Sequence, residues 1–282
     1  MPYIKLLPLI KDAEKNFPAI DIATRRYEAE SLISQVLNIS RIDIYIQDEH
    51  SISETEQDSI QQMFNRRKNN EPLQYILERT QFRDLDIKVG SGVLIPRPET
   101  EQIIDIVKSL NLNSPNVIDI GTGTGVIALS IAKEIKNSQV IGIDISQKAL
   151  DYAFKNKEIN NIKNVKFFIN DLCSGFDADK FNLIISNPPY VTEEEYNNLT
   201  PDVHDFEPKL ALESGRDGLD SINKLILQAY KTLKTDGYLL FEMGYLQGES
   251  ARVLLKSAGF KEIRIIKDFN DKDRFALSQK IA

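Results

Sequence analysis

The first 75 residues have the hydrophobic spacing of amphipathic helices. Apolar side chains recur three and four positions apart, and one such stripe comprises Ala29, Leu32, Ile33, Val36 and Leu37. A capping-box pattern, Ser53 followed by Glu56, begins a second helical stretch. No catalytic constellation accompanies these helices, so residues 1–75 are predicted to form a helical bundle that recognises or supports a partner.

The pattern changes after residue 75. Phe82, Leu85, Ile87 and Val89, with Gly90 and Gly92 following, predict a hairpin or extended connector over residues 76–95. A rigid loop with two prolines comes next, and it opens onto an amphipathic helix. This loop reads Ile95-Pro96-Arg97-Pro98-Glu99-Thr100-Glu101.

From residue 116 onward, short apolar runs alternate with helical patterns. Strands are predicted over residues 117–120, 140–144, 165–169, 181–185, 238–241, 263–266 and 275–278. Helices are predicted over residues 126–135, 149–154, 219–233 and 251–255. This alternation predicts an α/β domain over residues 96–282, with a doubly wound sheet that binds ligands at the carboxyl ends of its strands.

Composition limits the classes of protein. The 282 residues carry a net charge of −7, which lowers the expectation of a bare nucleic acid as substrate. One cysteine and two histidines exclude a disulfide within the chain and make a structural metal site improbable. The apolar runs are far too short to span a membrane, and the run beginning Met1-Pro2-Tyr3 lacks a signal-peptide layout. We therefore expect a cytoplasmic protein. We also expect a monomer.

A glycine-rich turn follows the first predicted strand. Gly121, Thr122, Gly123, Thr124 and Gly125 occupy the point where that strand would turn into its helix. Glycines allow a tight turn and let a ligand approach the backbone. The pattern is a weak indication by itself, but the fingerprint for dinucleotides requires a glycine where this chain has Val126. A pyrophosphate is therefore not the expected ligand.

Two aspartates stand at the ends of the next two predicted strands. Asp144 could accept hydrogen bonds from both hydroxyls of a ribose, and Asp171 from an adenine amino group, with Leu172 beside the ring. Each aspartate alone could equally cap a helix. Together with the glycine turn they predict a nucleoside site, which could hold NAD or S-adenosylmethionine.

The element Asn187-Pro188-Pro189-Tyr190 ends the fourth predicted strand. Neither proline has an N–H to continue a strand ladder, so the nearby carbonyl groups point beyond the strand end. The Asn187 side chain adds another acceptor. Such an arrangement suits a planar –NH2 group whose two hydrogens are accepted while its nitrogen faces an electrophile. With the glycine turn, it predicts an amino- or amide-nitrogen methyltransferase.

Taken together, the chain resembles the peptide chain release factor glutamine-N5 methyltransferases (the HemK/PrmC family) nearly end to end. The proline loop at residues 95–101 together with the Asn-Pro-Pro-Tyr element is the most specific part of this resemblance. Further matching residues are Asp119 to Gly125, Asp144-Ile145-Ser146, Glu207-Pro208, Ala211-Leu212, Asp217-Gly218-Leu219, Gly244, Gln247-Gly248 and Asp273-Arg274.

The resemblance implies a Rossmann-like methyltransferase domain with a seven-stranded mixed sheet and a small N-terminal helical domain. It implies S-adenosylmethionine as methyl donor and the glutamine of the Gly-Gly-Gln loop of release factors as acceptor. Two positions depart from the family: Glu78 and Asp271 stand where it usually has glycine. Both lie away from the glycine turn and the Asn-Pro-Pro-Tyr element, so they concern local loop geometry.

An amide nitrogen is a poor nucleophile, so we hypothesise that the enzyme acts mainly by positioning this nitrogen relative to the methyl group. The Asn187 side-chain oxygen and the Pro188 carbonyl would accept the two amide hydrogens and hold the nitrogen in line with the methyl group. Tyr190 would form an aromatic wall against the glutamine, with Pro189 and Arg97 also at the substrate.

Other polar residues near the predicted site have ordinary interpretations. Arg97 and Glu99 would either line the acceptor channel or fix the loop between domains. His204 is interpreted as a loop histidine rather than a general base, and Cys173 as a small packed side chain. Glu242 would either touch the methionine part of the donor or cap a loop, and the loop cap is favoured.

Three alternative functions remain open from the sequence. A sister family methylates a glutamine of a ribosomal protein, but Pro98-Glu99-Thr100 favours release factors. A DNA adenine-N6 methyltransferase shares the Asn-Pro-Pro-Tyr element, but it would need a basic surface for reading its target. A non-catalytic nucleotide-binding module would have no need of a clamp for nitrogen.

Overall fold

The computed structural model describes residues 3–19, 21–46 and 50–282. Met1 and Pro2, part of the N-terminal run considered above, lie outside the described residues. The chain divides into two compact units, one of residues 1–78 and 201–206, the other of residues 79–200 and 207–282. Within the described ranges, no helix is both long enough and apolar enough to cross a membrane.

The smaller unit is a bundle of helices around its own core. Its elements are β1 (Tyr3–Ile4), α1 (Leu6–Asn16), α2 (Ile22–Leu37), α3 (Asp43–Ile46), β2 (His50–Ser51), α4 (Glu54–Lys68), α5 (Leu73–Leu77) and, from the later segment, α10 (Pro201–His204). The predicted capping box at Ser53 and Glu56 is formed, and Ala29, Leu32 and Ile33 are buried as the helical spacing predicts. Phe17 and Phe64 pack edge to face in this core, with ring centroids 5.1 Å apart.

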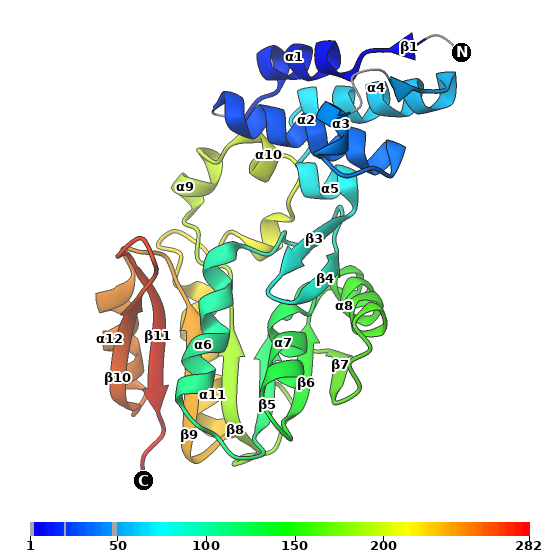
Figure 1. Cartoon of the computed structure of the whole chain (residues 1–282). Helices are drawn as coiled ribbons and strands as arrows, with labels where there is room; N and C mark the ends of the chain where they lie inside the picture. Colours follow the sequence, from blue (N-terminus) through cyan, green and yellow to red (C-terminus); the bar gives the residue numbers. More distant parts are fainter. Residues whose placement is uncertain (1–2, 20, 47–49) are drawn as a thin grey trace. The chain divides into compact units, whose positions relative to one another are not determined.

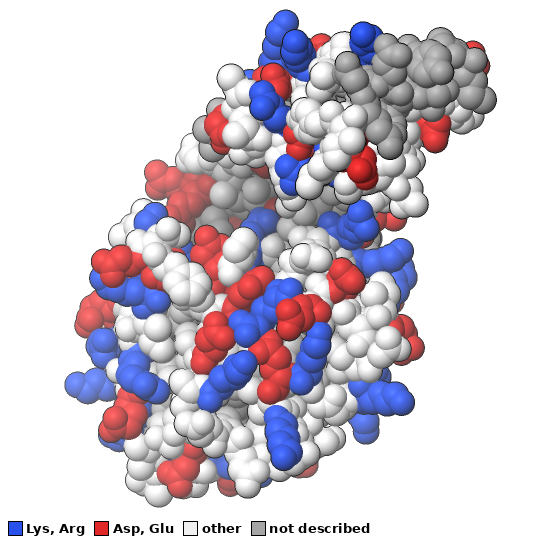
Figure 2. All heavy atoms as spheres, in the orientation of Figure 1, with Lys and Arg blue, Asp and Glu red and all other residues white. Residues whose placement is uncertain are grey.

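The larger unit begins with the predicted hairpin. Its strands are β3 (Arg79–Phe82) and β4 (Leu85–Lys88), joined by a tight turn. Arg83 in that turn bonds to Glu134 on α7 (Val126–Glu134) and to Asp105 on α6 (Gln102–Ser109). The hairpin is thus held within the larger unit. On the face of this unit that Figure 2 displays, basic and acidic side chains are interspersed.

In the described residues of this unit, seven strands form one mixed sheet in the order β10-β11-β9-β8-β5-β6-β7 (Figure 1). They are β5 (Asn116–Ile120), β6 (Gln139–Asp144), β7 (Val165–Ile169), β8 (Phe181–Ser186), β9 (Leu233–Glu242), β10 (Lys261–Lys267) and β11 (Asp273–Gln279). Besides α6 and α7, the unit contains η1 (Pro98–Glu101), α8 (Gln147–Ile159), α9 (Glu193–Asn197), η2 (Lys209–Ala211), α11 (Asp220–Thr232) and α12 (Gly248–Ser257). The predicted doubly wound α/β fold with a seven-stranded mixed sheet and an N-terminal helical region is confirmed.

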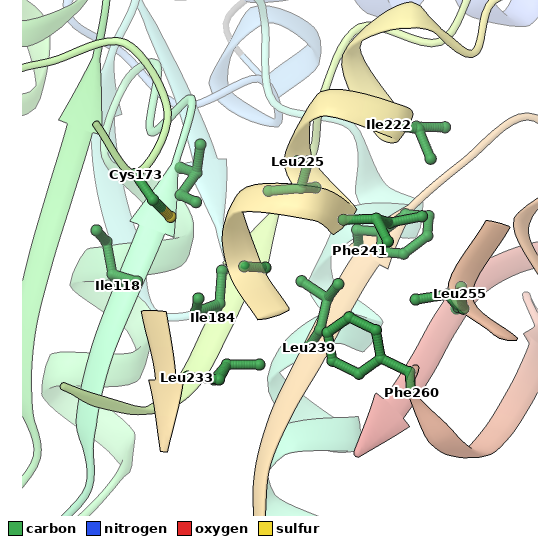
Figure 3. Close-up of a cluster of buried hydrophobic side chains, with 14 of the residues drawn as sticks. Ile118, Cys173, Ile184, Ile222, Leu225, Leu233, Leu239, Phe241, Leu255 and Phe260 are labelled. Atoms are coloured by element: carbon green, nitrogen blue, oxygen red, sulfur yellow. The ribbon is translucent and has the colours of Figure 1, made fainter. Parts of the chain in front are cut away.

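The central strands are buried on both faces. Leu183, Ile184 and Ile185 of β8 are each 0% exposed, which is typical of a parallel strand covered by helices on both sides. Figure 3 shows part of this core, where Leu225 of α11 lies close to Phe241 of β9. Cys173 is buried in the same cluster, in agreement with its interpretation as a packed side chain.

The strand order contains a topological switch point between β5 and β8. From β5 the chain proceeds outward to β6 and β7, then returns to β8 on the other side of β5. Parallel pairing sets Ile120 opposite Ser186, the last residues of these two strands. Ligands of open α/β sheets bind outside the strand ends at such a point. The glycine turn follows one of these strands and Asn187 follows the other.

Candidate active site

A cavity of about 400 Å³ lies at the carboxyl ends of the central strands. This volume is within the range of small-molecule sites. Its lining includes nearly all of the predicted site residues: Arg97, Gly121, Thr122, Gly123, Thr124, Asp144, Asp171, Leu172, Asn187, Pro188 and Pro189. Gly125 and Tyr190 do not line it. The fold thus brings together residues that are up to 92 positions apart in the chain.

The three glycines of the turn have left-handed backbone conformations. Gly121, Gly123 and Gly125 have φ angles of 69°, 55° and 85°, the left-handed region in which glycine is favoured. A Cβ at Gly121 would meet nothing within 4 Å, so the turn leaves open space at the cavity. A Cβ at Gly125 would instead lie 3.1 Å from Ala153 Cβ. Gly121 is therefore suited to the approach of a ligand, and Gly125 to the packing of helix against turn.

Asp144 connects two strand ends. Its Oδ2 accepts the N–H of Gly123 at 2.9 Å, and its Oδ1 accepts the N–H of Ser146 at 2.9 Å. Each carboxylate oxygen keeps a further lone pair, so both can still accept from a ribose. Burial raises the pKa of Asp144, while the two N–H groups oppose that rise. The geometry fits the predicted contact with ribose hydroxyls.

The predicted adenine contact at Asp171 is less closely tied to its strand. β7 ends at Ile169, so Asp171 lies two residues beyond the strand, and its side chain is exposed. Leu172 beside it has a φ of 49°, a strained conformation for leucine, and its carbonyl accepts the Asn170 side-chain N–H at 2.9 Å. Strain of this kind clusters at functional sites.

Two apolar side chains at the cavity were not anticipated from the sequence. Ile145 and Leu210 line it and are 55% and 64% exposed, so they offer apolar surface that an aromatic ring could cover. Ile145 follows Asp144 directly, and its isolated apolar position after a strand end is the signal that could have identified it.

A buried aspartate and a buried asparagine form hydrogen bonds that support the glycine turn. Asp119 Oδ2 accepts the Thr122 hydroxyl at 2.6 Å and the Ala128 N–H at 3.1 Å, and burial raises the pKa of Asp119 to about 7. Asn156 of α8 donates to the Thr124 carbonyl at 2.9 Å and to the Lys88 carbonyl at 3.1 Å. These contacts fix the shape of the turn before any ligand is bound.

Arg97 is tied to a second loop that lines the cavity. The Glu207 carboxylate accepts the Ile95 N–H at 2.9 Å and the Arg97 guanidinium at 2.5 Å, and Glu207 is 4% exposed. Pro96 and Arg97 therefore share one wall with the segment that follows Glu207. A charge-assisted pair at this burial restrains both loops.

The Asn187 side chain is oriented by Thr100. Its Nδ2 donates to Thr100 Oγ1 at 3.3 Å, and Thr100 Oγ1 donates to Glu242 Oε2 at 2.7 Å. Glu242 is the last residue of β9 and is 1% exposed. The favoured interpretation of Glu242 as a loop cap is therefore wrong, because its buried carboxylate accepts the side-chain hydroxyls of Thr100 and Tyr190 at the end of β9.

Tyr190 faces the core rather than the cavity. Its ring packs against the hydrophobic cluster of the sheet, and its hydroxyl donates to Glu242 Oε1 at 3.0 Å. Burial and the Glu242 charge raise the pKa of Tyr190. Tyr190 is connected to the cavity through its hydrogen bond to Glu242, which also accepts from Thr100. The predicted role of Tyr190 as an aromatic wall against the glutamine stays a prediction.

Gln247 fixes the backbone after the prolines. Its side chain donates to the Tyr190 carbonyl at 3.0 Å and accepts the Gly244 N–H at 2.9 Å. A Cβ at Gly218 would lie 2.2 Å from the same Tyr190 carbonyl oxygen, so glycine is required there. The matching residues near positions 218 and 247 therefore have a physical role around the Asn-Pro-Pro-Tyr element.

Two further observations concern His204 and metal-binding side chains. His204 belongs to the smaller unit and lies 2.7 Å from Asp205 Oδ1. Across the described ranges, no group of three or more His, Cys, Asp or Glu side chains is arranged to hold a metal ion.

Comparison with known proteins agrees with the geometry. The family described as Methyltransferase small domain matches residues 99–203, and the PrmC N-terminal domain family matches residues 8–77. A solved methyltransferase from Pyrococcus furiosus has the same fold, with a TM-score of 0.54 and 20% identity over 70% of this chain and 90% of that one.

Curated relatives match over nearly the full length. The release factor glutamine methyltransferase of Thermodesulfovibrio yellowstonii is 39% identical over 90% of this chain and 92% of its own. The protein of the same name from Francisella tularensis is 34% identical over 99% of both chains. This chain belongs to the release factor glutamine methyltransferase family.

Proposed function

We propose that the protein transfers a methyl group from S-adenosylmethionine to the side-chain amide nitrogen of the glutamine in the Gly-Gly-Gln loop of peptide chain release factors. The observation that carries this proposal is the pairing of Ile120 with Ser186. Because of it, Gly121 and Asn187 each directly follow a strand at the switch point, so the predicted clamp for an –NH2 group would adjoin the predicted donor turn.

The donor would be held by residues of the glycine turn and the next two strand ends. Gly121 and Gly123 allow its close approach, and the lone pairs left on Asp144 accept from the ribose hydroxyls. Asp171 and Leu172 would contact the adenine. When bound, S-adenosylmethionine supplies an electrophilic methyl group on its sulfonium sulfur.

The acceptor amide would be held by Asn187 and Pro188. Among the described residues, only Thr100 hydrogen-bonds the Asn187 side chain, and it does so through Nδ2, so Oδ1 is available as an acceptor. Oδ1 and the Pro188 carbonyl would each accept one amide hydrogen of the glutamine. Holding a nucleophile in line in this way can contribute on the order of 7–11 kcal/mol to lowering the barrier.

The remaining predictions concern what surrounds the reaction. Arg97 and Pro189 would contact the substrate loop, since both line the cavity. The helical unit would recognise the body of the release factor, acting as the N-terminal part of a monomeric, cytoplasmic enzyme that needs no direct contact with nucleic acid.

Peptide mass mapping tests the function. Purified release factor, a ribosomal-protein preparation and a DNA duplex would each be incubated with the protein and S-adenosylmethionine. We expect one added methyl group, on the glutamine of the Gly-Gly-Gln loop. Asn187→Ala should lower turnover by roughly two to three orders of magnitude, by analogy with the loss of one stabilising polar group in an active site.

A matched variant controls for damage to the strand. Asn182→Ala removes an asparagine from the other end of β8, where its side chain accepts the Asn116 N–H and does not line the cavity. It should retain turnover within a few-fold of the wild type. Methylation only of a ribosomal protein or of adenine would overturn the substrate, and donor binding without transfer to any acceptor would favour a non-catalytic module.

A further inference from the structure

Four polar side chains form one continuous chain of hydrogen bonds at the strand ends. Asn187 Nδ2 lies 3.3 Å from Thr100 Oγ1, and Thr100 Oγ1 lies 2.7 Å from Glu242 Oε2. Tyr190 closes the other side, with its hydroxyl 3.0 Å from Glu242 Oε1. Thr100 is 2% exposed and Glu242 is 1% exposed, so water cannot replace these partners freely.

The direction of this chain follows from counting hydrogens. A threonine hydroxyl has one hydrogen, and Thr100 directs it to Glu242 Oε2. When Thr100 donates its hydrogen to Glu242, its oxygen can only accept from Asn187. The amide of Asn187 must then present its NH2 group to Thr100, which leaves Oδ1 at the opposite end of the amide.

We propose that Thr100 and Glu242 are positioning residues that fix which end of the Asn187 amide meets the substrate. This inference rests on the proposed function, since it concerns how the same clamp is oriented. Tyr190 contributes by donating to the second oxygen of Glu242, which keeps that carboxylate as an acceptor on both sides. The clamp therefore presents an oxygen to the glutamine –NH2 rather than a competing N–H group.

Reversal of the amide would change what the clamp prefers. With NH2 in place of Oδ1, Asn187 would repel a glutamine amide and would instead donate to a carboxylate. Loss of the Thr100 hydroxyl removes the partner that selects one orientation. A side chain at position 242 with an N–H group of its own can donate to Thr100, and the hydroxyl hydrogen is then free to turn Asn187 around.

The test uses three substitutions at two positions in the full-length protein. Thr100→Val removes the hydroxyl at nearly constant shape, Thr100→Ser retains it, and Glu242→Gln replaces one acceptor oxygen with a donor. Thr232→Val is the matched control, because Thr232 is also a buried threonine, bonded to the Gln228 carbonyl on α11 and not at the cavity. Methyl transfer to release factor gives kcat and KM, and calorimetry gives the Kd for S-adenosylmethionine.

The decisive readout is how well each variant discriminates between two protein ligands. Release factor with its Gly-Gly-Gln glutamine, and the same protein with glutamate at that position, are compared as ligands of each variant. A loosened or partly unfolded site would weaken the binding of both ligands alike. A freed or reversed Asn187 amide would instead change the ratio of the two affinities. This ratio therefore separates positioning from general structural damage.

We expect Thr100→Val and Glu242→Gln to lower kcat by about tenfold or more and to reduce the preference for glutamine over glutamate by about fivefold or more. Thr100→Ser should restore kcat to within about threefold of wild type, and Thr232→Val should resemble wild type. The Kd for S-adenosylmethionine should change by less than about threefold in all of them, which also shows that they are folded.

Wild-type activity separates the two proposals. If the wild type transfers no methyl group to release factor, the proposed function fails. If it does, but Thr100→Val keeps both its kcat and its substrate preference, the positioning role of Thr100 is overturned. If Thr100→Ser is as defective as Thr100→Val, the hydroxyl is not what orients Asn187, and the inference fails on that account.

Discussion

Asp144 accepts the backbone N–H of Gly123 at 2.9 Å, so the carboxylate that ends β6 also holds the turn that follows β5. One residue thus serves both the turn and the predicted ribose contact. A parallel sheet makes this arrangement accessible, because the carboxyl ends of neighbouring strands meet at one edge.

Asp144→Asn should weaken binding of S-adenosylmethionine by roughly 10- to 100-fold, since an amide replaces one acceptor oxygen with a donor. Isothermal titration calorimetry measures this change. Asp151→Asn is a suitable control, because Asp151 is exposed on α8 and bonds to Gln147. Unchanged affinity in Asp144→Asn would show that this carboxylate holds the turn without contacting the donor.

Gly121→Ala and Gly125→Ala should fail in different ways. Both substitutions strain a left-handed position by about 1–2 kcal/mol. At Gly125 the new Cβ also meets Ala153 and Phe167 at 3.1 Å, so the main loss should be in the free energy of unfolding. At Gly121 the Cβ enters open space at the cavity, so the main loss should be in donor affinity.

Urea unfolding and donor titration of the two glycine variants distinguish these effects. The contrast would be refuted by Gly121→Ala that binds S-adenosylmethionine like the wild type. It would equally be refuted by Gly125→Ala that matches Gly121→Ala in stability, because the packing contact would then have no measurable cost.

Asp119 should make stability depend on pH. Burial raises its pKa from the ordinary 3.8 to about 7, so between these values the folded protein retains a proton that the unfolded chain has released. The stability from this group is fully present below about pH 4 and is lost as the pH rises to about 7. The slope is at most about 1.4 kcal/mol per pH unit.

Asp119→Asn removes this titration. Urea unfolding at several pH values should show the wild type losing stability relative to Asp119→Asn between about pH 4 and 7. Comparing the two proteins cancels the titration of groups that they share. Parallel curves over this range would mean that Asp119 titrates alike in the folded and unfolded chains.

Glu78→Gly should stabilise the protein. Glu78 ends α5 with a φ of 56°, the left-handed conformation in which glycine is favoured. Relief of this strain should outweigh the greater flexibility of glycine in the unfolded chain, with a net gain of about 0.5–1 kcal/mol. Gln62→Gly, at an exposed position inside α4, should lose about 1 kcal/mol. Equal losses in both variants in urea unfolding would contradict the role of backbone strain.

Both positions at which the resemblance predicts glycine have the same conformation. Asp271 has a φ of 59°, so it and Glu78 are both left-handed in this chain. The resemblance identified the positions, but it could not show that the backbone keeps the glycine-type conformation with another residue. That required the φ angles.

Local features of the sequence were sufficient for much of the site. The glycine turn and Asn187 each directly follow a strand, and Asp144 ends one. The alternation of strands and helices predicts that strand ends meet. Asp171 was identified in the same way, although β7 ends two residues before it. Their roles toward donor and substrate remain predictions that the experiments above test.

The fold class and the residues at the strand ends could be predicted from the sequence, because periodicity, glycines and prolines act over a few neighbouring positions. How those residues are held depends on contacts between distant parts of the chain. Thr100 and Glu242 are 142 positions apart, and neither belongs to a pattern that indicates the other. Their hydrogen bond forms because η1 and the end of β9 meet at the sheet edge, where burial makes an unpaired carboxylate costly.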